Sequence, residues 1–172
     1  MNLEYRSLLP EDFPADARVW VYQSSRLFSL SEALQIEKLL EDFIAQWNSH
    51  GAPVRGFATL FFGRFIILMA DERNAGVSGC STDSSVRLIK AIEEAYGVRM
   101  FDRQSLAFVH KDKVELLPLS QLRYGVEHGF LTPDTLYFNN LVQDKQSLEH
   151  QWIIPVKDSW LASRLPGVAK AS

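Results

Sequence analysis

One long stretch, residues 29–47, has the apolar periodicity of an amphipathic helix and constrains the fold more than any other feature. Its apolar side chains recur at three- and four-residue spacing, and they are Leu30, Ala33, Leu34, Ile36, Leu39, Leu40, Phe43, Ile44 and Trp47. Ser29 and Glu32 have the spacing of a capping box, which predicts that the helix begins after Ser29. Gly51 is expected to end it near His50. A helix with one apolar face must cover another element, so the chain needs a sheet or a second helix against it.

Short apolar runs before and after this helix supply the expected sheet. They are rich in β-branched and aromatic side chains, and Gly63-Arg64 separates two of them as a tight turn. A second helix is expected to be capped by Asp83 or Ser84 and stopped by Gly97. The expected elements after residue 17 are strands at 18–23, 54–62 and 65–70, the second helix between its cap and Gly97, and a hairpin formed by 106–110 and 114–117.

The order strand, helix, strand, strand, helix, strand predicts an α+β fold with an antiparallel sheet and helices on one face. A ferredoxin-like βαββαβ core has this order, and other α+β layouts remain open. We expect a single domain of 172 residues, with an N-terminal arm at 1–17, the core at 18–117 and a C-terminal extension at 118–172 packed on the core. Short helices at 120–128 and 147–152 and a short strand at 136–138 are expected in this extension. Its Trp152 and Trp160 are expected to pack on the core.

The composition narrows the classes of function. The chain is 47% hydrophobic and 23% charged, has a net charge of -3, and contains no cluster of Lys and Arg, so nucleic-acid binding is disfavoured. A single cysteine excludes an internal disulfide and a zinc site built from a cysteine pair. The N-terminus does not have the pattern of a secretory signal, and the longest apolar run, 65–70, is too short to span a membrane. We therefore expect a cytoplasmic protein.

Residues 69–87 leave a buried strand, carry the single cysteine and enter the second helix, and any site is expected there. Cys80 comes just before the predicted helix, where the helix dipole would lower the pKa of its thiol and make it reactive. Asp83 opposes this, because its carboxylate would compete for the same amides. The favoured interpretation is that Cys80 is a small buried apolar side chain.

The hydroxyls and glycines of the same loop form a candidate cradle for an anion. The candidate anion-binding residues are Ser78, Gly79, Ser81, Ser84 and Ser85. The chain has no Gly-x-x-x-x-Gly-Lys-[Ser/Thr] motif, which argues against a P-loop nucleotide hydrolase. Capping of the second helix explains these hydroxyls equally well and is the preferred interpretation.

Three carboxylates and two basic side chains are further candidates for catalysis or ligand binding. Asp71, Glu72 and Asp83 could act as acids or bases or hold a hard cation, although no ligand spacing is specific and a solvated turn is favoured. His50 and Arg103 are candidate helpers of catalysis. No pattern of metal-binding histidines occurs, so no metal site is predicted. No cofactor is indicated either.

Several segments resemble a family of small uncharacterised bacterial proteins, over nearly the whole chain. They are 19–24, 46–51, Asp71-Glu72, 78–86, 101–103, 134–139 and 159–161. Members of that family often carry the label ABC-transporter ATPase, which this sequence contradicts because it has neither a phosphate loop nor the length of an ATPase domain. The resemblance implies no mechanism.

Two hypotheses of function remain. The first is a non-catalytic binding or assembly domain whose residues 78–85 contact a partner or a small anion. The second is an enzyme that uses Cys80 or a carboxylate between Asp71 and Asp83. The absence of a specific catalytic motif favours the first. The sequence identifies no partner and leaves self-association open.

Overall fold

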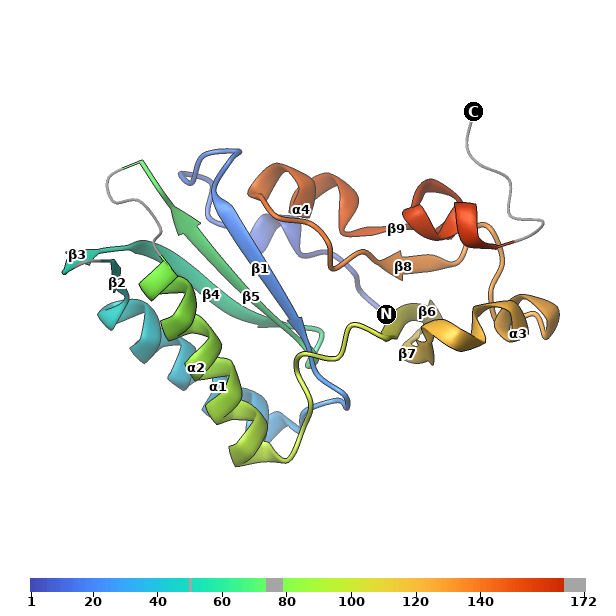
Figure 1. Ribbon diagram of the computed structural model, residues 1–172, viewed down its shortest axis with the longest axis horizontal. Coiled ribbons are helices and arrows are strands. Elements are labelled where there is room, and N and C mark those ends of the chain that lie inside the picture. Colours follow the sequence, from blue (N-terminus) through green and yellow to red (C-terminus); the bar gives the residue numbers. More distant parts are fainter. Residues whose placement is uncertain (50, 74–78, 166–172) are drawn as a thin grey trace. The chain divides into compact units, whose positions relative to one another are not determined.

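The computed structural model describes residues 1–49, 51–73 and 79–165, and these divide into two compact units. The N-terminal unit comprises Leu3–Phe101 and Val142–Glu149. The C-terminal unit comprises Met1–Asn2, Asp102–Leu141 and the residues from His150 on. Helices and antiparallel sheets occur together, which confirms the α+β class (Figure 1). The single-domain expectation stays a prediction.

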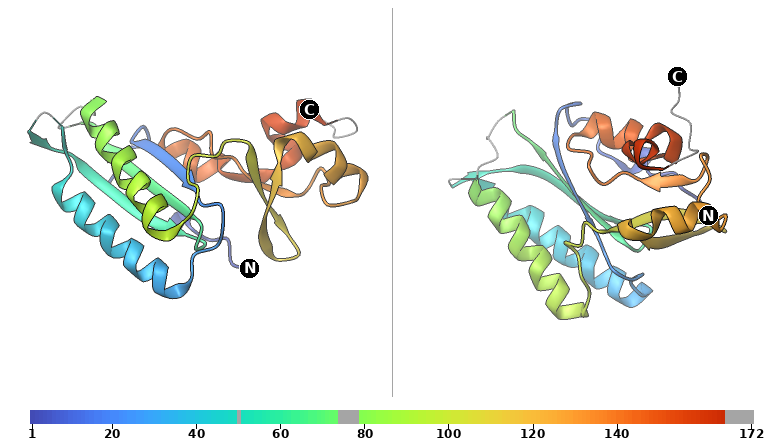
Figure 2. Two further views of the ribbon diagram at one scale, coloured as in Figure 1. Left: turned by 60° about the horizontal axis from the view of Figure 1, so that its bottom comes forward. Right: turned by 45° about the vertical axis from the view of Figure 1, so that its right-hand side comes forward.

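The N-terminal unit is built on a three-stranded antiparallel sheet of order β1-β5-β4. The strands are β1 (Arg18–Gln23), β4 (Arg55–Phe61) and β5 (Phe65–Asp71), close to the predicted runs. Two helices, α1 (Leu30–Gln46) and α2 (Gly79–Tyr96), lie on the same face of this sheet (Figures 1 and 2). This part of the predicted architecture is confirmed.

Every residue of β5 is buried, because both faces of the central strand are covered. On the helix side, its side chains join one apolar cluster with those of both helices: Ile66, Leu68, Ile36, Leu40, Ile89 and Ile92. Residues 3–17, expected as an arm, instead pack into the unit, with Tyr5, Leu9 and Phe13 buried. The ring of Tyr5 lies 5.9 Å from that of Phe61. The N-terminal segment is therefore part of the core.

The predicted capping box at the start of α1 is confirmed. Ser29 Oγ accepts a hydrogen bond from the Glu32 N–H at 3.2 Å, and Glu32 Oε1 accepts one from the Ser29 N–H at 2.9 Å. The predicted end of the helix was wrong, because α1 ends at Gln46 with Trp47 as its C-cap. Gly51, with φ of +80°, lies between two short paired strands, β2 (Asn48–Ser49) and β3 (Ala52–Pro53).

The ferredoxin-like arrangement is completed only in part. The order β1-β5-β4 is that of its first three strands, but β6 (Ser105–His110) does not join this sheet in the described part of the chain. Both edges of β6 are occupied in the C-terminal unit, by β7 (Lys113–Pro118) and β8 (Leu136–Phe138). A returning segment runs beside β1 instead: the Val19 N–H donates to the Gln143 carbonyl at 2.9 Å, and the Lys145 N–H donates to the Ala17 carbonyl at 2.9 Å.

The C-terminal unit contains a four-stranded antiparallel sheet of order β7-β6-β8-β9, where β9 is Ile153–Pro155. Its helix α3 (Leu122–Glu127) follows β7, and α4 (Lys145–Gln151) continues from the N-terminal unit into this one. Trp152 is fully buried, and half-buried Trp160 donates from Nε1 to the Tyr137 hydroxyl at 3.1 Å. Both tryptophans pack into the unit, in accord with the core role expected of them.

The turn between β6 and β7 offers a stability test. Lys111 and Asp112 have φ of 49° and 62°, so both residues of this two-residue turn adopt the left-handed conformation. Asn-Gly fits such a turn best, and the double variant Lys111→Asn/Asp112→Gly should raise the free energy of unfolding by about 1 kcal/mol. Urea denaturation measures the gain. Lys113→Asn, one residue further and inside β7, should give no gain; equal gains would argue against relief of turn strain.

Candidate functional site

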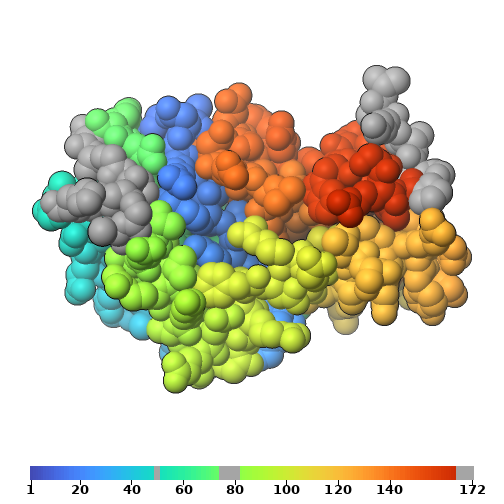
Figure 3. Space-filling view, in the orientation of Figure 1, coloured from blue at the N-terminus to red at the C-terminus, as the bar shows by residue number. Residues whose placement is uncertain are grey.

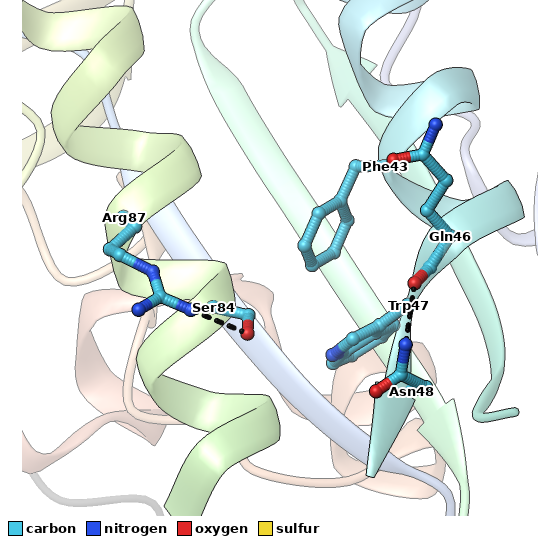
Figure 4. Close-up of a pocket in the computed structure, with 6 residues that line it drawn as sticks. All are labelled: Phe43, Gln46, Trp47, Asn48, Ser84 and Arg87. Carbon is cyan, nitrogen blue, oxygen red and sulfur yellow. Dashed lines mark hydrogen bonds between the residues drawn. The ribbon is translucent and has the colours of Figure 1, made fainter. Parts of the chain in front are cut away.

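A pocket in the N-terminal unit lies between the C-terminal end of α1 and α2, and its volume is about 220 Å³ (Figure 4). The residues that line it are Phe43, Gln46, Trp47, Asn48, Ser84 and Arg87. The first four come from the end of α1 and the start of β2, and the last two come from α2. Atoms of α2 lie at the surface on the face shown in Figure 3. The pocket therefore joins two segments far apart in the sequence.

Trp47 forms a fixed wall of the pocket. Its side chain is only 3% exposed, and its ring lies 5.0 Å from that of Phe43 and 5.8 Å from that of Trp20. Behind it, β4 carries Gly56, where a Cβ would lie 2.7 Å from Trp47 Cε3. A larger residue at this position would push the indole out of its place. The absence of a side chain at Gly56 thus lets Trp47 pack against the sheet.

Arg87 supplies the positive charge of the pocket. In the described part of the chain its guanidinium makes one hydrogen bond, from Nη2 to Ser84 Oγ at 3.1 Å, and no carboxylate pairs with it. A guanidinium has five N–H donors in a planar fork that suits carboxylate and phosphate oxygens. On the α1 side, the side-chain amide of Asn48 donates from Nδ2 to the backbone carbonyl of Gln46 at 3.2 Å (Figure 4). The pocket thus combines a guanidinium that no described carboxylate neutralises with amides and aromatic rings.

The start of α2 corrects the expected role of the serine-rich loop. The helix begins at Gly79, so Asp83 and Ser84 lie inside it and do not cap it. Ser85 is buried and donates from Oγ to the Thr82 carbonyl at 2.6 Å, which explains how this hydroxyl is accommodated inside a helix. Asp83 is exposed. Of the anion-binding candidates whose side chains are described, Ser84 lines the pocket and Ser85 does not.

Four other candidates cannot be placed in this site. Ser78 and His50 lie outside the described residues, and so do the side chains of Cys80 and Ser81. Gly79 is the first residue of α2. The prediction that Cys80 is buried therefore stays a prediction.

Asp71, a candidate acid or base, lies at the end of β5 and is bound by two arginines. Its side chain is 1% exposed and accepts hydrogen bonds from Arg73 Nη2 at 2.7 Å, from the Arg73 backbone N–H at 3.0 Å and from Arg55 Nη1 at 3.0 Å. Arg55 also pairs with Asp12 of the N-terminal segment. These bonds, above all those from the Arg73 side chain, hold the pKa of Asp71 well below its usual range. A carboxylate held this way is a weak base.

Glu72 and Arg103 are both exposed. Glu72 follows Asp71 in the N-terminal unit, and Arg103 belongs to the C-terminal unit. Among the described residues, no three His, Cys, Asp or Glu side chains are grouped so that they could hold a metal ion. The two arginines that bind Asp71 also bond to Asp12, so this cluster ties the N-terminal segment to the sheet.

The pocket was missed from the sequence, apart from Ser84. Phe43 and Trp47 belong to the apolar periodicity of the first helix and were assigned to the core, which is correct for most of their surface. Arg87 follows the serine-rich loop and carries no motif of its own. The signal that could have suggested the site is the pair of polar residues at the end of the helix, because Gln46 and Asn48 flank an aromatic residue there.

In comparisons with family models, curated proteins and solved structures, nothing matches this chain. The resemblance to small bacterial proteins therefore stays a prediction. None of the helices within residues 1–49, 51–73 and 79–165 has the length and apolarity needed to cross a membrane.

Proposed function

We propose that this chain is a cytoplasmic, non-catalytic binding domain that accepts an anionic oxygen group in the pocket between α1 and α2. The observation that carries the proposal is the guanidinium of Arg87, which lines the pocket and has no carboxylate partner among the described residues. Charge-assisted hydrogen bonds from a guanidinium to a carboxylate or a phosphate are about twice as strong as neutral ones. The ligand class is therefore a small carboxylate or phosphate.

The size and lining of the pocket support a small ligand. Its volume of about 220 Å³ is below the roughly 300–1,000 Å³ typical of sites for drug-sized molecules. The rings of Phe43 and Trp47 on one side and Arg87 on the other suit a ligand with one charged end and a compact body. Binding is favoured over catalysis because Asp71, the best-placed candidate base, is neutralised by Arg55 and Arg73.

Nuclear magnetic resonance titration of the full chain with sodium acetate and with inorganic phosphate tests this proposal. We expect saturable shifts of the Trp47 indole N–H and of the Ser84 and Arg87 amides with at least one of the two anions. Arg87→Gln should weaken the apparent affinity tenfold or more, because the charged donor is lost. The Trp47 signal is assigned by its loss in Trp47→Phe.

Two controls separate a site from general ionic effects. Arg123→Gln removes an exposed arginine of α3 in the C-terminal unit and should leave the affinity unchanged. Sodium chloride at the same ionic strength should give no saturable shift. Equal affinities of wild type and Arg87→Gln, or shifts that never saturate with either anion, would argue against the proposal.

A further inference from the structure

The outer edge of β4 is open in the described part of the chain, where β5 is the one strand that pairs with it. Leu60 shows which peptide groups point outward, because its N–H donates to Glu37 Oε1 of α1 at 2.8 Å and not to β5. Peptide groups of an antiparallel strand alternate in direction, so those of Gly56 and Ala58 point outward as well. No hydrogen bond to these two outward groups is present among the described residues. The open stretch is short, because the next outward N–H groups on either side are already bonded, that of Val54 to the Trp47 carbonyl at 3.0 Å and that of Leu60 to Glu37. The donors and acceptors of Gly56 and Ala58 are complementary to another extended strand.

Exposed leucines lie beside this edge. Leu30 and Leu34 of α1 are 77% and 65% exposed, although both belong to the apolar pattern of the helix. They share one row of the helix surface with Glu37, because residues three and four apart are neighbours on a helix. Since Glu37 contacts the outward N–H of Leu60, this row is on the side of the β4 edge. Leu27 is also exposed and lies near the turn that follows β4. A Cβ at Gly63, in that turn, would be 2.9 Å from Leu27 Cδ1.

The charges of the same helix row are acidic. Glu41 continues the row after Glu37, is exposed, and has no ion pair among the described residues. The neighbouring acid Asp42 is already neutralised by Lys38, whose Nζ lies 3.2 Å from Asp42 Oδ1. A strand laid along β4 therefore meets apolar surface at the Leu30 end and negative charge at the Glu41 end.

We propose that the β4 edge binds an extended segment of a partner protein as an added strand, and that this segment carries an apolar side chain followed by basic ones. The apolar side chain covers Leu30 and Leu34, and the basic side chains face Glu37 and Glu41. A second copy of this chain fits less well, because antiparallel pairing of two β4 strands about a two-fold axis places the leucine end of each α1 row against the acidic end of the other, which offers the carboxylates no basic partner. The proposal does not rest on the pocket at Arg87, although Trp47 of that pocket lies against Gly56 of β4.

A designed peptide tests the proposal with the full chain. The probe is acetyl-Thr-Leu-Thr-Lys-Thr-Lys-Thr-amide, whose leucine and lysines share one face of an extended strand. We expect saturable amide shifts at Gly56, Ala58 and Leu60 and slower hydrogen exchange of the Ala58 amide. The peptide with Glu in place of both Lys should bind at least fivefold more weakly, and so should the peptide N-methylated at the residues that face β4.

Charge reversal on the protein gives the matching test. Glu41→Lys should weaken binding of the lysine peptide and strengthen binding of the glutamate peptide, each by about threefold or more. Glu127→Lys changes the net charge equally but lies in α3 of the C-terminal unit, and should change neither affinity.

Three outcomes would contradict the binding of a partner segment at the β4 edge. Failure of the lysine peptide to shift these amides at millimolar concentration would overturn the proposal. An N-methylated peptide that binds as well as the parent would also overturn it, since the strand hydrogen bonds would then contribute nothing. Sedimentation of the chain alone tests the other occupant: if self-association protects the Ala58 amide, the edge serves a second copy and a partner segment is excluded.

Discussion

Replacing Asp71 with alanine should lower the free energy of unfolding by about 2 kcal/mol, because several charge-assisted hydrogen bonds are lost at once. The carboxylate is buried, and its removal would leave the guanidinium groups of Arg55 and Arg73 without their common acceptor. The expected loss is moderate for a buried charge because those side chains are 38% and 56% exposed, so that water solvates them in the variant. Urea denaturation at pH 7 measures the loss.

A surface ion pair provides the control for this substitution. Asp134 pairs with Lys157 at 2.7 Å, but its side chain is 78% exposed. Asp134→Ala should therefore cost less than about 0.5 kcal/mol. If the two alanine variants lose the same stability, the account of Asp71 as the acceptor that holds the N-terminal segment to the sheet is wrong.

The low pKa of Asp71 also predicts how stability depends on pH. The folded pKa lies below the unfolded value of about 3.9, so the contribution of Asp71 is complete above that value and is lost as pH falls toward the folded pKa. Asp71→Asn should therefore lose less stability than wild type between about pH 5 and pH 2. Glu32, whose hydrogen bonds from Arg26 lower its pKa to about 2, still titrates in both proteins. The readout is accordingly the difference between the two pH profiles.

Gly56→Ala should lower the free energy of unfolding by about 2 kcal/mol, because the added methyl group overpacks the site behind Trp47. The new Cβ would lie 2.7 Å from Trp47 Cε3 and 3.0 Å from Ile44 Cδ1. The indole cannot move away freely, since its ring also packs on Phe43 and Trp20. Alanine is the better residue in a strand on backbone grounds, so a loss of stability would identify the contact with Trp47 as the cause. Thermal and urea denaturation both measure this loss of stability.

Gly125→Ala is the matched control for this overpacking. A Cβ at Gly125 would meet the methyl end of Leu117 at 2.9 Å and that of Leu131 at 3.3 Å, and leucine side chains can yield by a change of rotamer. Alanine also gains about 1 kcal/mol over glycine inside a helix such as α3. We expect almost no net change. A Gly56→Ala variant as stable as this control would show that Trp47 is not fixed by β4.

Local patterns in the sequence predicted the local structure well. Ser29 and Glu32 define the start of α1 because a capping box involves residues three apart. The β6–β7 hairpin was predicted around residues 111–113, and its turn consists of the first two of them. The start of α2 was misplaced because a run of Ser, Thr and Asp is equally typical of a cap and of a loop. Pairing between distant segments was not predictable, and so the segment beside β1 proved to be residues 142–146 and not β6.

In the candidate site too, local features could be predicted from the sequence and contacts between distant residues could not. Asp71 is marked by its place after a buried strand, but its chemistry is set by Arg55, which lies on the neighbouring strand opposite to it. The pocket requires the end of α1 to lie against α2, and no spacing within either helix contains that information. Ser84 was predicted as a candidate site residue because it belongs to the serine-rich loop. Arg87, which supplies the charge, was not.

The Nε–Hε resonance of Arg87 tests the central proposal most directly, because it reports on the group that should bind the anion. It can be assigned by its disappearance in Arg87→Gln and followed during titration of the full chain with inorganic phosphate and with acetate. We expect a saturable shift that follows the same one-site curve as the Trp47 indole N–H with at least one of these anions. An Arg87 resonance that stays in place with both anions, up to the highest concentration reached, would contradict the proposed binding function.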